Sequence, residues 1–190
     1  MKKLVMVLCL ILLPIVLLSQ EREIKKDVNT YFELLSEHKV SEALDMVHPE
    51  LLSMLGKASF QAQYEKMFNN SEVKISFGKF QINSVSDVFA FDEKTYALVD
   101  YNFNIIYKVD LSKDDKGTLK ALLLSNYQNK FGAENVVLVA PDEYHITTKR
   151  ELMAVNANSY DTWKVLELDE GIRALAATFI PQEVLSHFSR

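Results

Sequence analysis

The chain has 190 residues, of which 48% are apolar, 25% charged and 11% aromatic. That composition excludes a disordered, collagen-like or low-complexity chain, and it supplies enough apolar side chains for a full hydrophobic core. The formal net charge of −5 argues against a nucleic-acid partner, because a surface that binds nucleic acid gathers Lys and Arg.

The N-terminus has the layout of a secretory signal peptide. Two lysines precede residues 4–18, an uncharged and almost wholly apolar run, and a polar stretch begins at Ser19. A membrane-spanning helix needs about 20 apolar residues, and Pro14 interrupts this shorter run. We therefore predict a signal peptide over residues 1–19, cleaved after Ser19, with an uncleaved N-terminal anchor as the alternative.

Export follows from that prediction. We expect a periplasmic or extracellular protein whose only contact with a membrane is the signal itself. Cys9 is the only cysteine and lies within the apolar run, so the mature chain would hold no disulfide, thiol nucleophile or cysteine-ligated metal. Residues 20–190 would form a single domain that its core stabilises without disulfides.

Three helices are predicted in the N-terminal third. Apolar residues recur at spacings of three and four over residues 21–37, which predicts an amphipathic helix. Its apolar face consists of Ile24, Val28, Tyr31, Phe32 and Leu35. A second helix is expected over residues 41–47, with Ser41 as its N-cap and an end before Pro49. A third helix is expected over residues 59–68.

The middle of the chain changes to a period of two. Over residues 95–109 the odd positions are apolar and the even positions mostly polar, which predicts a long strand with one buried face. Residues 73–82 also alternate, but the phase changes at Gly78, where we expect a β-bulge and a bend in the sheet. Residues 92–94 are the expected turn that joins the two strands as an antiparallel hairpin.

The last part of the chain adds elements of both kinds. A helix is expected over residues 116–130, with Gly132 as its C-cap. Strands are expected over residues 136–139, 144–155 and 163–168. Pro181 suits the first position of a final short helix. The sequence thus predicts an α+β fold: N-terminal helices packed on a bent antiparallel sheet, with an extra mid-chain helix and a short C-terminal helix.

This order of elements resembles the nuclear transport factor 2-like (cystatin-like cone) superfamily. The local segments that suggest it are Tyr-Phe-Glu-Leu-Leu at 31–35, Val-Ser-Glu-Ala-Leu at 40–44 and Asp-Thr-Trp-Lys-Val-Leu at 161–166. The resemblance covers about residues 24–168 and implies an exported bacterial member with a cone-like sheet, an apolar pocket and a homodimer. The helix at 116–130 and the tail after residue 168 are additions to the usual cone.

Enzymes of that superfamily, as the resemblance implies, use an Asp, His or Tyr inside the pocket of the cone. The catalytic candidates here are His145 and Asp100, although strand periodicity places both on a polar face. The pocket candidates are Tyr101, Phe103, Tyr107 and Trp163. No sequence pattern supports a metal site, and no cofactor is expected.

Several functions remain open from the sequence. The aromatic side chains of the expected sheet would either fill a solid core or enclose a pocket for a small hydrophobic ligand. The preferred hypothesis is an exported, non-enzymatic binding or interaction module of the periplasm or cell exterior. The alternative is a small isomerase- or cyclase-type enzyme with an apolar pocket. A third hypothesis is an envelope accessory subunit that is inactive alone.

Overall fold

The computed structural model describes residues 2–114 and 116–189, with side chains described from residue 19 onward. The helices are α1 (Lys2–Ser36), α2 (Val40–Asp45), α3 (Pro49–Leu55), α4 (Lys57–Phe68), α5 (Thr118–Phe131), α6 (Glu170–Ala176) and α7 (Gln182–Phe188), with a 3-10 turn η1 at Ala133–Asn135. The strands are β1 (Val73–Val85), β2 (Phe89–Phe91), β3 (Lys94–Val109), β4 (Val136–Ala140), β5 (Glu143–Ala157) and β6 (Lys164–Glu167).

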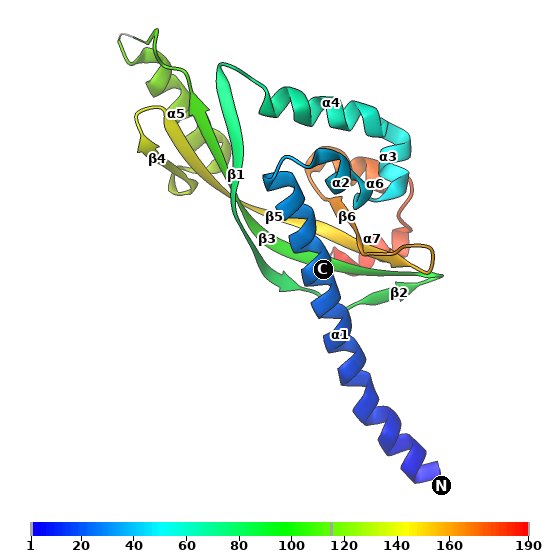
Figure 1. Cartoon of the computed structure of the whole chain (residues 1–190). Coiled ribbons are helices and arrows are strands. Elements are labelled where there is room, and N and C mark those ends of the chain that lie inside the picture. Colours follow the sequence, from blue (N-terminus) through cyan, green and yellow to red (C-terminus); the bar gives the residue numbers. More distant parts are fainter. Residues whose placement is uncertain (1, 115, 190) are drawn as a thin grey trace.

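Helix α1 buries the apolar face that its sequence predicts. Ile24, Val28, Tyr31, Phe32 and Leu35 are all buried. The Phe32 ring stacks on Phe80 of β1. The C-terminal half of α1 lies across the curled sheet (Figure 1). Within residues 2–114 and 116–189, no helix is long and apolar enough to cross a membrane.

Two details of the helical predictions are wrong. Helix α2 begins at Val40, so Ser41 lies inside the helix, and Lys39 at the cap position makes no side-chain cap bond. Helix α3 is absent from the prediction, which treats Pro49 only as the end of a helix. Pro49 is instead the first residue of α3, where its missing N–H costs nothing because the first turn of a helix has no partner for it.

In the described part of the chain, six strands form one antiparallel sheet, in the order β1-β3-β5-β4, with β2 beside β3 and β6 beside β5. The predicted bulge is confirmed, because the register of β1 on β3 shifts between Phe77 and Phe80, around Gly78. The predicted antiparallel pairing of β1 with β3 is confirmed. The turn lies at Asp92 and Glu93, but it closes the hairpin of β3 with β2, a short strand absent from the prediction, and Lys94 already belongs to β3. Bulges increase local twist, which helps this sheet to curl.

The architecture is α+β, with helices packed on a strongly curled, cone-like antiparallel half-barrel (Figure 1). The predicted mid-chain helix is α5, which ends at Gly132 with a φ of +90°. The predicted C-terminal helix is α7, which begins just after Pro181. Helix α6 is absent from the prediction, and its N-cap Asp169 accepts a hydrogen bond from the backbone N–H of Ile172.

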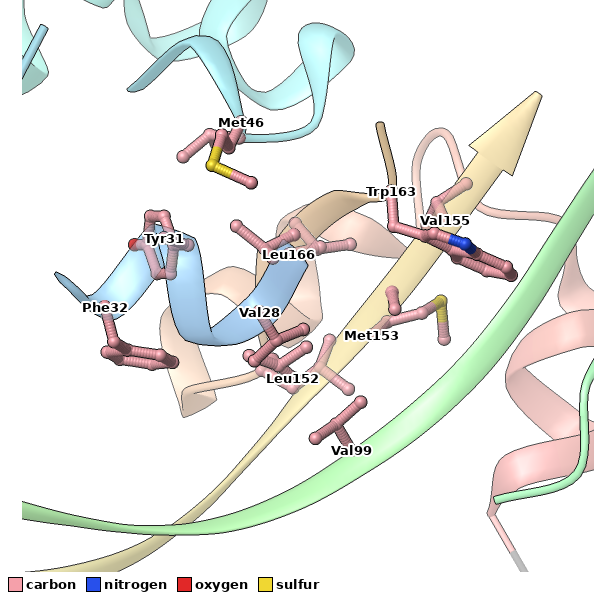
Figure 2. Close-up of a cluster of buried hydrophobic side chains, with 14 of the residues drawn as sticks. Val28, Tyr31, Phe32, Met46, Val99, Leu152, Met153, Val155, Trp163 and Leu166 are labelled. Atoms are coloured by element: carbon pink, nitrogen blue, oxygen red, sulfur yellow. The ribbon is translucent and has the colours of Figure 1, made fainter. Parts of the chain in front are cut away.

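Both faces of the sheet contribute to the core. On the concave face, Val28 and Phe32 of α1 belong to the same cluster as Val99 of β3 (Figure 2). On the opposite face, Leu98 and Met153 line a small cavity together with side chains of α6 and α7. The helices at the two ends of the chain therefore cover opposite sides of the same strands.

Candidate functional site

A cavity of about 380 Å³ lies between α1, α4 and the concave face of the sheet. This volume is within the range of about 300–1,000 Å³ that is common for small-molecule sites. Its lining consists of Phe32, Leu35, Phe60, Gln63, Tyr64, Met67, Ile75, Phe77, Phe103, Ile105, Tyr107, Arg150 and Glu167. Most of these side chains are apolar, so the cavity offers a hydrophobic space with a few polar groups.

The walls of the cavity follow from the periods of two strands and one helix. Ile75 and Phe77 of β1 are paired with Tyr107 and Ile105 of β3, and alternate residues of neighbouring strands point to the same side. Helix α4 contributes residues spaced by three and four: Phe60, Gln63, Tyr64 and Met67. The apolar faces of these three elements thus converge on one space.

Arg150 and Glu167 form the polar end of the cavity. Oε1 of Glu167 accepts a hydrogen bond of 3.1 Å from the Tyr31 hydroxyl. Its Oε2 accepts one of 3.2 Å from the Tyr101 hydroxyl. Each carboxylate oxygen therefore accepts one hydrogen bond from a phenol.

Arg150 reaches the same place from β5, where it is paired with Tyr101 of β3. Its Nη1 lies 3.7 Å from Oε2 of Glu167, which is close enough for charge attraction but too far for a hydrogen bond. Within the residues that the structure describes, the guanidinium donates no hydrogen bond. The two charges of the polar end therefore differ, since the anion is hydrogen-bonded and the cation is not.

Burial keeps the tyrosines of this region protonated. It raises the pKa of Tyr31 well above its ordinary value, and the neighbouring Tyr64 and Glu167 raise it further. Burial and then the charge of Glu167 raise the pKa of Tyr64 to about 12. The same two causes raise the pKa of Tyr101 above its usual range. The hydroxyls of Tyr31 and Tyr101 therefore remain donors to Glu167 at neutral pH.

Two of the four predicted pocket residues line the cavity, and a third contacts one of its polar groups. Phe103 and Tyr107 line the cavity, and Tyr101 reaches its polar end through Glu167. Trp163 is not part of this lining. It is buried beside Met153 and Val155 (Figure 2).

His145 and Asp100 lie outside the cavity. The pairing of β3 with β5 runs without a register shift from Lys94 to Lys108, so strand alternation places both residues on the face opposite Tyr101. Asp100 forms an ion pair of 3.1 Å with Lys149. It is paired with Glu151, far along β5 from His145, so the two candidates are not brought together.

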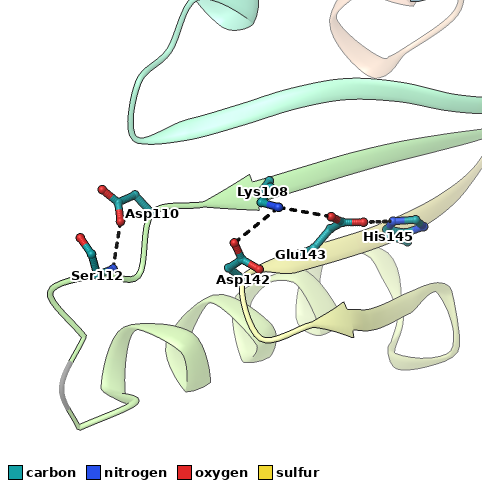
Figure 3. A network of polar contacts seen from close by, with 6 residues as sticks. All are labelled: Lys108, Asp110, Ser112, Asp142, Glu143 and His145. Carbon is teal, nitrogen blue, oxygen red and sulfur yellow. Dashed lines mark hydrogen bonds and ion pairs between the residues drawn. The ribbon is translucent and has the colours of Figure 1, made fainter.

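A surface network of ion pairs surrounds His145 (Figure 3). Its Nε2 lies 2.7 Å from Oε1 of Glu143. Nζ of Lys108 lies 3.9 Å from Glu143 and 3.8 Å from Asp142. The side chain of His145 is thus already engaged with a carboxylate on the sheet surface.

Sequence reasoning missed Arg150 and Glu167, the two charged residues of the cavity. A signal for Arg150 was present, because the even positions of β5 from Tyr144 to Ala154 are otherwise uncharged. A charge on the buried phase of a strand marks a polar site or an ion pair. Glu167 shares its side of β6 with the apolar Val165, two residues earlier, and gives the same kind of signal.

In the described residues, no group of three or more His, Cys, Asp or Glu side chains is placed to hold a metal ion. No known family model matches the chain, and a comparison with curated proteins finds no similar sequence. The resemblance to the nuclear transport factor 2-like superfamily therefore stays a prediction.

Proposed function

We propose that this chain is an exported, non-enzymatic module of the nuclear transport factor 2-like kind that binds a small hydrophobic ligand in its cavity. Export is supported by the signal-like pattern of residues 1–19. Binding is supported by the cavity between α1, α4 and the sheet.

One observation carries the binding proposal. Side chains that fill a protein interior normally pack to the density of organic crystals and leave few voids larger than a water molecule. Here the apolar faces of α1, α4, β1 and β3 leave a partly open space of about 380 Å³ between them instead of closing on one another. A largely apolar space with a few convergent polar groups is the usual form of a small-molecule site.

A small isomerase- or cyclase-type enzyme is the second candidate. It is favoured by Glu167, because general acid–base catalysis needs a titratable group at the end of an apolar pocket. However, both oxygens of Glu167 already accept phenol hydrogen bonds, and His145 and Asp100 lie on the other face of the sheet. Binding without turnover is therefore the better-supported function.

The binding proposal is tested by titrating the purified domain with decanol, decanoate and decylamine below their aggregation concentrations, using isothermal calorimetry. We expect saturable binding of one molecule per chain for at least one of them. Ile75→Trp places an indole in the space that Ile75 lines, so it should weaken that binding at least about tenfold. Absence of binding by all three probes would contradict the proposal.

The matched control is Ser76→Trp. Ser76 is the next residue of β1, is exposed and points away from the cavity because strand side chains alternate. This variant adds the same indole to the same strand outside the cavity, so we expect unchanged affinity. Equal losses in both variants would assign the effect to β1 itself and count against the cavity as the site.

A further inference from the structure

The polar end of the cavity holds a guanidinium that donates no hydrogen bond within the described residues, beside a carboxylate that already accepts two. Glu167 accepts from Tyr31 and Tyr101 through its two oxygens. Arg150 carries five N–H donors, and none of them is matched within the residues that the structure describes. A ligand that satisfies this end must therefore bring acceptors.

Arg150 lies at the border between the apolar cavity and solvent. It occupies the phase of β5 that carries buried Thr148 and Leu152, but its side chain is 37% exposed, so water reaches the guanidinium. Its distance of 3.7 Å from Glu167 leaves the N–H donors free for a ligand, and a planar carboxylate would accept two parallel hydrogen bonds from them.

The polar end also opens towards a charged recess, which Arg150 and Glu167 line together with Lys149, Glu151 and Arg173. The recess lies where β4 pairs with β5 only up to Ile146 and β6 pairs with it only from Leu152. A ligand head group at Arg150 would therefore stay close to solvent while its tail lies in the cavity.

Two of the three other cations that line the recess, Lys130, Lys149 and Arg173, form ion pairs. Lys149 pairs with Asp100 at 3.1 Å, and Arg173 pairs with Glu151 at 2.5 Å. Of these four cations, Arg150 alone also lines the apolar cavity, so it stands where the recess meets that cavity.

We propose that the ligand is an amphipathic carboxylic acid, whose carboxylate binds Arg150 and whose apolar chain lies against α4 and β1. This inference rests on the proposed function, since it names the class of ligand for the same cavity. A single guanidinium next to the carboxylate of Glu167 suits a head group with one negative charge.

The three decyl probes of the binding test differ only in their head groups, so they also test this inference. We expect wild type to bind decanoate at least about tenfold more tightly than decanol, as a charge-assisted pair implies. Arg150→Gln should remove that preference while leaving decanol affinity within about twofold. Arg150→Lys, which keeps the charge but loses the two-pronged geometry, should retain only part of it.

Lys74→Gln is the control for net charge, because Lys74 is an exposed residue of β1 outside the cavity. It should keep the full preference for decanoate, and circular dichroism should show that all variants are folded. Glu167→Gln removes the neighbouring negative charge and should tighten decanoate binding.

Each remaining outcome overturns the inference in a distinct way. Equal affinity for decanoate and decanol, a decanoate preference that survives Arg150→Gln, or tightest binding of decylamine would overturn the acid assignment and leave the binding function standing. Failure of all three probes to bind would overturn both the inference and the proposed function.

Discussion

His48 shows how burial can outweigh a neighbouring charge at a single residue. Its side chain is fully buried, and its ring stacks on Phe179 at a centroid distance of 5.2 Å. Nδ1 lies 3.1 Å from Oε2 of Glu50, but neither ring nitrogen makes a hydrogen bond within the described residues. Burial lowers the pKa of His48 to about 4, against attraction from Glu50 and with repulsion from Lys94.

This lowered pKa makes the stability of the fold depend on pH. Folded His48 stays neutral down to about pH 4, whereas an unfolded histidine takes up its proton near its ordinary value of 6.5. The unfolded state therefore binds more protons between these values, and the free energy of unfolding should fall by about 1 to 3 kcal/mol as pH drops across that window. Urea denaturation at a series of pH values measures this slope.

The matched variants for that measurement are His48→Gln and His145→Gln. The first removes the buried imidazole, so its unfolding free energy should vary less between pH 6.5 and pH 4, whatever its absolute stability. The second removes a half-exposed histidine of the sheet surface and controls for the loss of one imidazole. A slope that is unchanged by His48→Gln would show that other groups cause the pH dependence.

At the level of elements, Asp27 ties the first helix to the last strand. Its carboxylate is buried in α1, and Oδ2 accepts a hydrogen bond of 2.9 Å from the backbone N–H of Trp163. Trp163 directly precedes β6, which carries Glu167 into the cavity. The Asp27 side chain thus holds α1 against β6, two elements that are distant in sequence and that both border the site.

Asp27→Ala should lower the free energy of unfolding by about 1 to 3 kcal/mol, because it leaves the Trp163 N–H without its acceptor in a buried place. Asp27→Asn keeps an oxygen acceptor and should cost less. Glu23→Ala changes an exposed residue of the same helix and serves as the control. Thermal unfolding of the three variants measures the differences, and equal midpoints for Asp27→Ala and Glu23→Ala would contradict the role of this bond.

The elements that sequence could predict are those long enough to show their period. Helix α1 and strand β3 repeat their apolar pattern several times, and the structure buries those same positions. Helices α3 and α6 have seven residues each, which is about two turns and too few to reveal a helical period. Helices α2 and α7 are as short, and they were predicted from a nearby proline that marks a helix end or start. The bulge at Gly78 was predictable because a one-residue slip reverses the apolar face of β1.

The site was less predictable than the strands that build it. Phe103 and Tyr107 could be assigned to a pocket from the alternation of β3 alone. The pairing of Arg150 with Tyr101 depends on the register between β3 and β5, and the approach of Glu167 depends on where β6 joins β5. Such long-range registers are set by packing across the whole fold, which a local period does not contain.

For the molecule as a whole, function depends on which side of the sheet each helix covers. Helices α1 and α4 cover the concave face but leave the cavity open. Helices α6 and α7 cover the opposite face, where Ala176, Leu185 and Phe188 line a second cavity of about 230 Å³ with Leu98. The C-terminal tail therefore completes the core without closing the candidate site.

Removal of residues 182–190 should accordingly separate stability from binding. Val184 of α7 is fully buried, so even Val184→Ala should lower the free energy of unfolding by about 1.5 to 3 kcal/mol. Glu183→Ala at the exposed neighbouring position should change it little.

The truncated chain should lose more stability than Val184→Ala, because Leu98 and Met153 lose their cover. It should bind a hydrophobic dye and self-associate in light scattering. Since α7 does not line the candidate site, the folded fraction of Val184→Ala should keep wild-type affinity for the decyl probes. A monomeric truncated chain with wild-type stability would show that α7 is not part of the core.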